Sequence, residues 1–241
     1  MSEQRIALVT GANKGIGFAA AEGLARHGTT VVVAARAHDK GKIAAERIGG
    51  RPVVLDVTDA ASVRAAARTV EEWYGRLDVL VNNAGISGGR AGQGVGDAAE
   101  DVLRQVFETN LFGVVRVTEA FLPLLRRSAD ARIVNVSSGT GSLGWMTDPA
   151  HYFARMPGVL GYPVSKTALN MLTVQYAKSL GPDGITVNAI APGPCGTDFA
   201  TALGMELPRT AAEGAAIIVK LATQAERPTA GFHDDNGPVP W

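Results

Sequence analysis

Short runs of β-branched and other apolar residues alternate along the chain with longer segments rich in Ala, Leu, Arg and Glu. The short runs are almost continuously hydrophobic, which is typical of parallel strands buried on both faces of a sheet. Alternation of such strands with helical segments predicts βαβ units. We expect a weak strand near Gly231 and Phe232, and six clear strands over residues 6–9, 30–35, 52–55, 79–81, 132–136 and 185–190.

The segments between these strands predict six helices. They span residues 15–27, 39–48, 60–74, 97–125, 162–180 and 211–223. Right-handed crossovers would wrap these helices over both faces of one twisted sheet. The sequence therefore predicts an α/β protein with a doubly wound Rossmann fold: a mostly parallel seven-stranded sheet with helices on both faces, formed as a single domain over residues 1–241.

Two stretches interrupt the alternation and are expected to be loops. Residues 87–96 contain five glycines, and residues 139–161 contain several glycines and two prolines. Long loops inside compact domains are usually functional or disordered. Both would begin at the carboxyl ends of strands, where sheets of this kind bind their ligands. We therefore expect them beside a ligand site.

Composition narrows the classes of protein that fit. The 241 residues include 23 basic and 23 acidic side chains, and a chain without basic excess is not expected to bind nucleic acid. The single cysteine excludes an intramolecular disulfide, and the four widely spaced histidines predict no metal site. No apolar run approaches the roughly 18 residues of a membrane helix. With no room for a signal peptide before the first strand, the expected location is the cytoplasm.

A glycine-rich turn follows the first predicted strand and opens the first predicted helix. It reads Thr-Gly-Ala-Asn-Lys-Gly-Ile-Gly over residues 10–17. Glycines permit a tight turn and close approach of the backbone, while the free amides and positive dipole end of a helix N-terminus suit a pyrophosphate. The turn predicts a dinucleotide site that includes Gly11, Asn13, Lys14, Gly15, Ile16 and Gly17.

The end of the second predicted strand indicates which dinucleotide is bound. An acidic residue there would hydrogen-bond the ribose hydroxyls of NAD, but this strand ends at Ala35 and is followed by Arg36. A guanidinium can bind phosphate oxygens in a bidentate manner. Arg36 therefore favours the 2′-phosphate of NADP(H), and Lys14 would add a second positive charge. The alternative is that both are solvated surface cations.

Further motifs follow in a fixed order along the chain. They are Asn82-Asn83-Ala84-Gly85 after the fourth strand, Asn110 on the next helix, Ser137-Ser138 after the fifth strand, Tyr162-Pro163-Val164-Ser165-Lys166, and Pro192-Gly193 with Thr197 after the sixth. Together with the glycine turn, they resemble the classical short-chain dehydrogenases and reductases over essentially the whole chain. The resemblance implies hydride transfer between a nicotinamide and a carbonyl or alcohol.

The resemblance also implies roles for individual residues. The family's catalytic tetrad is matched by Asn110, Ser138, Tyr162 and Lys166, with Tyr162 as acid or base, Lys166 on the nicotinamide ribose and Asn110 holding a water. Ser138 is preferred to Ser137 because the family's catalytic serine is usually the second of such a pair. The cofactor would also contact Asp56, Val57, Asn83, Ala84, Gly85, Pro192, Gly193 and Thr197. Asp56 is equally well placed to cap the next turn.

The chemistry of these residue types agrees with such roles. Four positions apart on a helix, Tyr162 and Lys166 would share a face with Cβ atoms about 5 to 6 Å apart. A nearby ammonium favours tyrosinate, so we expect the pKa of Tyr162 to fall below about 10. In reduction, Tyr162 would protonate the alkoxide that forms as hydride arrives, and Ser138 would donate a hydrogen bond to the same oxygen. Taken singly, each is also compatible with an ordinary surface or turn position.

The spacing between Ser138 and Tyr162 is longer than the common family spacing, which indicates an insertion within residues 139–161. The carbonyl-reductase branch of the family has an insertion in this region, and Asn13-Lys14 and the final residues 238–241 also look like that branch. Either the insertion forms an apolar wall or lid over a carbonyl substrate, or it is a surface flap that packs its own aromatics. The predicted substrate contacts are Trp145, Tyr152, Phe153 and Cys195.

The leading prediction is an NADPH-dependent reductase of a ketone, aldehyde or quinone. The same site would oxidise an alcohol if the cofactor ratio favoured that direction, and a nucleotide-binding regulator on this fold is a third reading. A regulator would be expected to lack part of the tetrad, whereas this chain retains all four positions. The expected partner is a small carbonyl or alcohol substrate, with no nucleic acid or membrane, and both monomer and homo-oligomer stay open.

Overall fold

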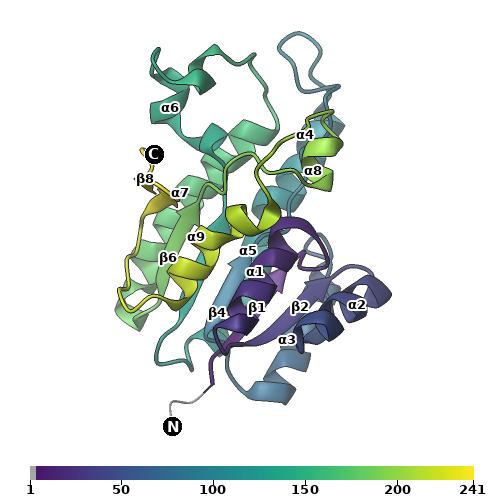
Figure 1. Ribbon diagram of the computed structural model, residues 1–241, viewed down its shortest axis with the longest axis vertical. Helices are drawn as coiled ribbons and strands as arrows, with labels where there is room; N and C mark the ends of the chain where they lie inside the picture. The colour runs from purple at the N-terminus through teal and green to yellow at the C-terminus, as the bar shows by residue number, and fades with distance from the viewer. Residues whose placement is uncertain (1–3) are drawn as a thin grey trace.

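The computed structural model describes residues 4–241, and its strands form one sheet (Figure 1). Eight strands lie in the order β3-β2-β1-β4-β5-β6-β7-β8, and all neighbours are parallel except β7 with β8. Their bounds are β1 Ile6–Thr10, β2 Thr30–Ala35, β3 Arg51–Val54, β4 Val79–Asn82, β5 Arg132–Val136, β6 Thr186–Ile190, β7 Phe232–Asp234 and β8 Gly237–Pro238. The predicted doubly wound α/β fold is confirmed.

The strand count of seven was wrong by one. The additional strand, β8, has two residues and turns back antiparallel to β7. A segment this short shows no hydrophobic alternation, so the sequence pattern could not reveal it.

Nine α-helices are assigned in residues 4–241. They are α1 Gly15–Arg26, α2 His38–Ile48, α3 Ala60–Tyr74, α4 Glu100–Phe107, α5 Gly113–Leu125, α6 Leu143–Thr147, α7 Tyr162–Leu180, α8 Asp198–Thr201 and α9 Ala211–Thr223. The helix expected over residues 97–125 is interrupted by a π-helical turn, Glu108–Phe112. The stretch expected to be a loop over residues 139–161 contains α6 and the short 3-10 turns Gly139–Gly141 and Tyr152–Arg155.

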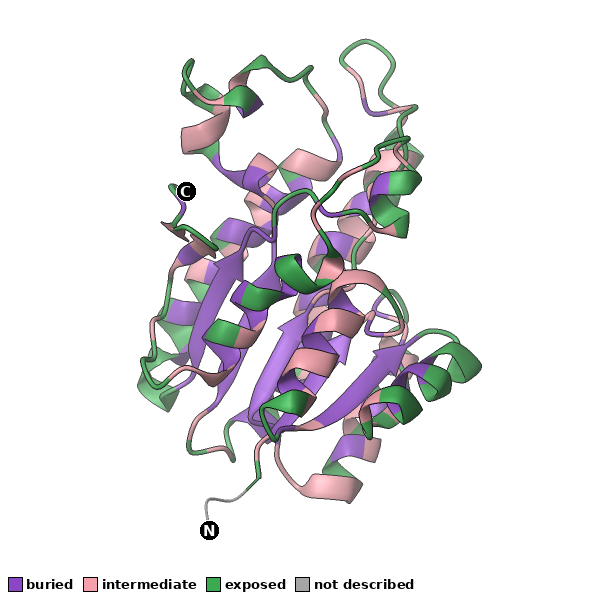
Figure 2. Cartoon of the chain, viewed as in Figure 1, coloured by how far each residue is buried: buried purple, intermediate pink, exposed green. Residues whose placement is uncertain are grey.

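Two apolar cores lie on the two faces of the sheet, which is buried between helices (Figure 2). Alternate residues of β1 point to opposite faces, so Leu8 packs with one core and Val9 with the other. The core around Leu8 includes Val63 of α3, Phe121 of α5 and Tyr176 of α7. The core around Val9 includes Leu24 of α1, Ala45 of α2 and Ile218 of α9.

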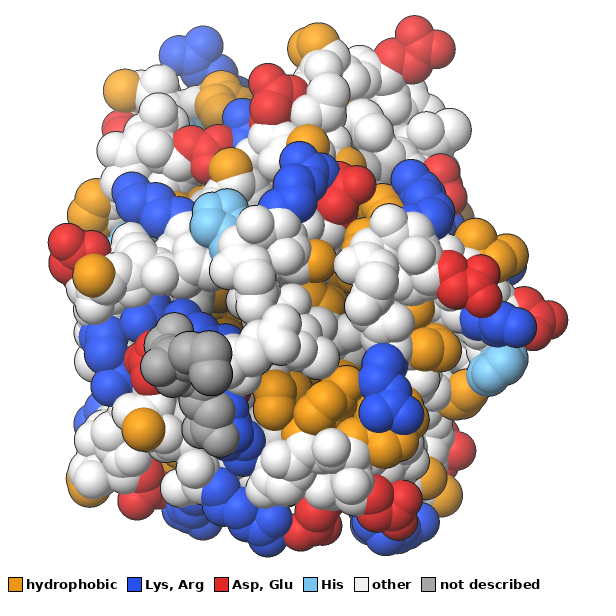
Figure 3. All heavy atoms as spheres, turned by 60° about the horizontal axis from the view of Figure 1, so that its bottom comes forward, with side chains coloured by type: hydrophobic (Ala, Val, Ile, Leu, Met, Phe, Trp, Pro, Cys, Tyr) orange, Lys and Arg blue, Asp and Glu red, His pale blue; other side chains and the backbone are white. Residues whose placement is uncertain are grey.

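The amino ends of the strands carry a cluster of charges that has a structural role. Arg5, Arg132 and Arg227 converge on Asp130, with N–O distances of 2.8, 3.1 and 3.0 Å. Arg5 also donates to the carbonyl of Ala222, and Arg132 donates to that of Leu221. Both carbonyls are near the end of α9, so the arginines satisfy groups that lack partners within the helix. Figure 3 shows Lys and Arg side chains gathered on one side of this end.

The carboxyl ends of the strands face the loops that carry most of the predicted site residues. The segments after β4 and β5, including α6, project beyond this edge (Figure 1). Within residues 4–241, no helix combines the length and the apolar character needed to cross a bilayer.

Candidate active site

The glycine turn is fixed to the end of β4 by Asn83. The Asn83 side-chain amide donates to the carbonyl of Thr10 at 2.8 Å, and the Thr10 hydroxyl accepts from the backbone amides of Asn83 and Ala84 at 2.9 and 3.0 Å. A Cβ at Gly17 would lie 2.6 Å from the Gly11 carbonyl oxygen and would collide with the Asn83 amide. Only glycine permits this close approach, so main-chain atoms rather than side chains form the surface of the turn here.

The N-terminus of α1, which follows this turn, has no side-chain cap. Lys14 occupies the N-cap position without a capping hydrogen bond, and the first turn contains no acidic residue. By contrast, α9 begins with a complete capping box between Thr210 and Glu213. The uncapped amides and the positive dipole end of α1 fit the pyrophosphate of a dinucleotide.

The predicted 2′-phosphate residues lie beside this turn. Arg36 is exposed directly after β2, and its charge reaches Asp56. The Lys14 ammonium makes a 2.6 Å ion pair with Asp198, at the start of α8. This pair joins the glycine turn to a segment on the other side of the site.

Asp56 caps the turn after β3, which is one of the two roles that the sequence suggested for it. Its carboxylate accepts from the backbone amide and the hydroxyl of Thr58, at 2.9 and 2.7 Å. Burial acts to raise the pKa of Asp56, but the Thr58 hydrogen bonds and the charges of Arg36 and Arg116 outweigh it and hold the pKa below its usual range. The contact with adenine stays a prediction.

Tyr162 is the first residue of α7 and lies above the carboxyl end of β5. Its ring centroid is 5.6 Å from the ammonium nitrogen of Lys166, which is one helical turn further on. The Lys166 ammonium is buried and donates to the carbonyl of Val136, the last residue of β5, at 2.8 Å. The structure therefore brings the predicted tyrosine and lysine together.

The expected fall in the pKa of Tyr162 is wrong in this structure. Burial raises the pKa of Tyr162 to about 12, and a hydrogen bond from the Ser138 side chain only partly opposes this. Burial also lowers the pKa of Lys166 to about 8. Removal from water disfavours both charged forms, so the ammonium does not impose ionisation on the phenol.

The two neighbouring serines have different surroundings. The Ser137 hydroxyl is buried and donates to the Asn170 side chain of α7 at 2.6 Å. The Ser138 hydroxyl lies 2.9 Å from that of Thr140, and the Ser138 side chain is close enough to the Tyr162 phenol to act against the rise in its pKa. Ser138 is therefore the serine whose hydroxyl faces the tyrosine.

Asn110 lies within the π-helical turn and is completely buried. Its side chain accepts from the Ile86 amide and donates to the Ile86 carbonyl, both at 2.9 Å, and also donates to the Ser165 hydroxyl at 3.1 Å. Ser165 in turn donates to the carbonyl of Tyr162 at 2.7 Å. Asn110 thus joins the strand β4 loop to the first turn of α7, which explains an asparagine inside a helix.

The insertion places an aromatic stack beside Ser138. Trp145 stacks on His151 with ring centroids 4.7 Å apart, and His151, Tyr152 and Phe153 contact one another. A Cβ at Gly139, directly after Ser138, would lie 2.6 Å from the Phe153 ring and 2.9 Å from that of Trp145. The aromatics therefore pack on one another and also lie against the predicted site.

The loop after β6 approaches the glycine turn. The Thr197 side chain is 3.7 Å from where a Cβ of Gly15 would be, and Gly193 has a positive φ of 73°. Cys195 faces inward: it is buried and its thiol lies against Gly214 of α9. Burial raises the pKa of this thiol, and its position argues against the predicted contact with substrate.

Two residues of the site were not predicted from the sequence. The ring of Phe199 in α8 lies 5.4 Å from that of Tyr162. Gln93, in the loop after β4, is buried and its side chain accepts from the backbone amide of Tyr162 at 3.0 Å. Neither residue belongs to a local motif, so only the fold reveals their proximity to Tyr162.

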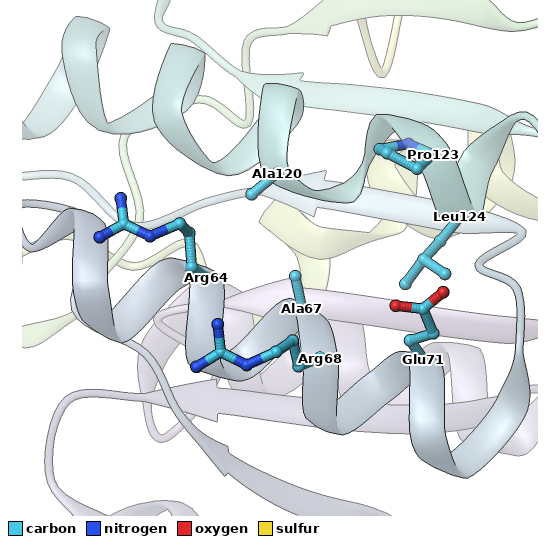
Figure 4. Close-up of a pocket in the computed structure, with 7 residues that line it drawn as sticks. All are labelled: Arg64, Ala67, Arg68, Glu71, Ala120, Pro123 and Leu124. Carbon is cyan, nitrogen blue, oxygen red and sulfur yellow. The ribbon is translucent and has the colours of Figure 1, made fainter.

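A hollow of about 220 Å³ lies elsewhere, between α3 and α5 (Figure 4). It is lined by Arg64, Ala67, Arg68, Glu71, Ala120, Pro123 and Leu124. Glu71 is paired with Arg127 at 2.9 Å. None of the predicted site residues lines this hollow, so it is separate from the site at the carboxyl edge.

Known proteins resemble the chain over most of its length. Residues 5–207 match the family model described as short chain dehydrogenase. The short-chain dehydrogenase anuI of Penicillium roqueforti is 41% identical in an alignment of 229 positions that covers 91% of this chain and 88% of that protein. The 3-oxoacyl-(acyl-carrier-protein) reductase FabG of Vibrio harveyi is 35% identical in an alignment of 203 positions that covers 83% of this chain and 78% of that protein.

Solved structures agree with these matches. An NADPH-bound carbonyl reductase from chicken fatty liver has a TM-score of 0.84 and 30% identity, over 99% of this chain and 100% of that chain. A short chain dehydrogenase of Shigella flexneri complexed with NADP has a TM-score of 0.83 and 28% identity, over 95% of this chain and 96% of that chain.

Proposed function

The chain belongs to the short chain dehydrogenase family of oxidoreductases, and we propose that it is an NADPH-dependent carbonyl reductase with Tyr162 as the general acid. The single observation that carries this proposal is the grouping of three side chains at the carboxyl end of β5. The Ser138 side chain is close enough to the Tyr162 phenol to act on its pKa, and the buried Lys166 ammonium lies 5.6 Å from the centroid of the phenol ring. Tyrosine, serine and lysine so placed can bind and protonate one carbonyl oxygen.

NADP(H) is the cofactor that fits the residues beside the glycine turn. The uncapped amides of α1 would hold the pyrophosphate, and Arg36 would hold the 2′-phosphate. The end of β2 has no carboxylate for the ribose hydroxyls of NAD. The NADP in the Shigella flexneri structure and the NADPH in the chicken carbonyl reductase agree with this choice. When bound, the cofactor supplies the hydride.

The protein's own residues would orient the substrate and move the proton. The Ser138 hydroxyl would donate to the carbonyl oxygen, and the Tyr162 phenol would donate its proton as negative charge develops there. Lys166, held by the Val136 carbonyl, would place a positive charge near that oxygen and hold the nicotinamide ribose. Asn110 would keep the first turn of α7 in place through Ser165, in addition to holding a water as predicted.

The protonation state of Tyr162 favours the reducing direction. With a pKa raised to about 12, the phenol carries its proton at neutral pH. A protonated phenol is ready to act as an acid, whereas oxidation of an alcohol needs the phenolate as base. The same site would still run backwards under a high ratio of oxidised cofactor.

An apolar ketone, aldehyde or quinone fits the surroundings of Tyr162. Trp145 and Phe153 border the serine side, and Phe199 lies against the tyrosine ring. Pockets for small molecules are mostly apolar with a few placed polar groups. The similarity to FabG adds 3-oxoacyl thioesters to the candidate substrates.

The proposal is tested by the loss of NADPH absorbance with a panel of carbonyl compounds. The panel contains an aryl ketone, an aliphatic aldehyde, a quinone and a 3-oxoacyl thioester, each assayed with NADPH and with NADH. We expect turnover of at least one compound and a preference for NADPH. Binding of NADPH without turnover of any compound would favour a nucleotide-binding regulator instead.

A further inference from the structure

We propose that Gln93 is a positioning residue for the reaction, which fixes Tyr162 by capping the first amide of α7 from outside the helix. This inference rests on the proposed role of Tyr162 as the acid. Gln93 lies in the glycine-rich loop after β4, 69 positions before Tyr162 in the chain.

The side chain of Gln93 is buried and fully engaged. It is 2% exposed, and its Oε1 accepts from the Tyr162 amide at 3.0 Å. Its Nε2 donates to the carbonyls of Ser87 and Gly89 at 2.9 and 2.6 Å. One amide therefore ties three backbone groups together, and the loop after β4 is folded around it.

The start of α7 needs a cap that its own sequence does not provide. The residue before Tyr162 is Gly161, which has no side chain to act as a cap, and the residue after it is Pro163, which has no N–H. The Tyr162 amide is thus a helix-terminal donor without an intrahelical acceptor. A Cβ at Gly161 would collide with Gln93 Oε1, so the glycine makes room for the cap.

The backbone around Gln93 also holds the end of the insertion. The Gln93 carbonyl accepts from the Leu160 amide at 2.8 Å, and Gly94 pairs with Val159 in an antiparallel bridge. The loop after β4 and the last residues of the insertion are therefore one unit, and Tyr162 follows directly from it. A shift of this unit would displace the phenol relative to Ser138, and about 1 Å of misplacement can cost on the order of 100-fold in rate.

The test compares Gln93→Leu with a matched control, Asn188→Leu. Asn188 is 3% exposed and also uses its side-chain amide to join segments: it donates to the Pro228 carbonyl at 2.7 Å and accepts from the Gly231 amide at 3.0 Å. Both variants lose a buried amide, but only one loses a contact with Tyr162. We expect Gln93→Leu to lower kcat by about 10- to 100-fold and to change the Kd for NADPH little. Asn188→Leu should keep a kcat near that of the wild type.

A second variant, Gln93→Met, matches the length of the glutamine side chain but has no amide to accept from the Tyr162 N–H. Its kcat should fall as that of Gln93→Leu does. It also keeps the proposal testable if the leucine variant does not fold. An unchanged kcat in a folded Gln93→Leu or Gln93→Met, or an equal loss in Asn188→Leu, would each overturn the proposal.

Hydrogen exchange at the Tyr162 amide separates this proposal from the proposed function. Exchange should be slow in the wild type and fast in Gln93→Leu, whether or not the protein turns over any carbonyl. If Tyr162→Phe keeps full activity while that amide is protected, the catalytic role fails and the cap stands. If the amide exchanges equally fast in both proteins, the cap itself is refuted.

Discussion

The two sides of Tyr162 are built in different ways. On the cofactor side, the glycine turn and the uncapped start of α1 present backbone groups, and Asn83 holds the turn by bonding to the Thr10 carbonyl. On the substrate side, the surroundings are side chains: the stack of Trp145 and His151, and the ring of Phe199. One side is a shape of the main chain, and the other is a set of side chains from distant segments.

This difference indicates which residues on each side can be substituted without loss of the fold. A backbone cradle tolerates no added Cβ at Gly17, but it accepts any dinucleotide whose phosphates reach α1. On the proposed assignment, selectivity between cofactors would then depend on few side chains, chiefly Arg36. A side-chain wall can be altered residue by residue, so the substrate side should determine which carbonyl is reduced.

The largest effect is expected where the two sides meet, at Tyr162. Tyr162→Phe removes the acid but keeps the ring, so kcat should fall by about 100- to 10,000-fold while the Kd for NADPH stays nearly unchanged. Steady-state kinetics and NADPH fluorescence titration measure the two quantities.

Tyr176→Phe is the matched control for this variant. Tyr176 is on the same helix, about four turns after Tyr162, and its hydroxyl donates to Glu119 of α5 at 2.8 Å. The control should keep its kcat and lose only some stability. If Tyr162→Phe is as active as the wild type, Tyr162 is not the general acid of the reaction.

The next largest effect is expected from Arg36→Asp on the cofactor side. The substitution replaces the proposed phosphate-binding cation with a carboxylate that can bond ribose hydroxyls, so KM for NADPH should rise by about 10- to 100-fold while KM for NADH is spared or falls. Arg68→Asp makes the same change of charge on an exposed site of α3 and should leave the preference unaltered. An unchanged preference in Arg36→Asp would mean that Arg36 is a solvated surface cation.

The position of the glycine turn at the edge of the sheet was predictable because its signals are local. Residues 10–17 lie between a hydrophobic run and a helical pattern, and the sequence alone places them at the edge of the sheet. Tyr162 and Lys166 are four positions apart, so one helical turn brings them together. The sheet, its parallel strands and the arrangement of helices follow from the same kind of short-range pattern.

The substrate side was predictable only in part because its contacts join distant segments. The aromatic residues of the insertion could be recognised from the sequence. The capping of Tyr162 by Gln93 could not, because it depends on how two loops fold against each other. The π-helical turn around Asn110 breaks no sequence pattern, so the helix was expected to be continuous. The pKa of Tyr162 was predicted in the wrong direction because burial, which is set by tertiary packing, raises it and outweighs the opposing effect of Ser138.

A smaller, selective effect is expected from Trp145→Ala on the substrate side. Loss of the indole beside Gly139 removes apolar contact that a bulky aryl ketone would make and a small aldehyde would not, so kcat/KM for the ketone should fall by about tenfold relative to the aldehyde. Trp73→Ala, the same substitution on α3, should not change this ratio. An unchanged ratio in Trp145→Ala would identify the insertion as a flap that packs its own aromatics.

The smallest effect is expected at the ion pair that joins the two sides. Lys14 and Asp198 are 2.6 Å apart, but their side chains are 64% and 75% exposed, so the pair should contribute little to stability. If Lys14 binds the cofactor as proposed, the Asp198 carboxylate would compete with phosphate oxygens for the same ammonium. Asp198→Asn should therefore leave the melting temperature almost unchanged and lower the Kd for NADPH by about two- to fivefold at low salt, with the difference fading as salt is added.

Asp183→Asn is the control, since Asp183 pairs with Arg126 at 2.8 Å on segments that carry no predicted site residue. Its Kd for NADPH should equal that of the wild type. Weaker NADPH binding in Asp198→Asn would reverse the interpretation of the pair: the carboxylate would then serve to hold α8 against the glycine turn over the cofactor. In that case the two sides of Tyr162 would act as one closed site, because the binding of the cofactor would depend on a residue of the substrate side.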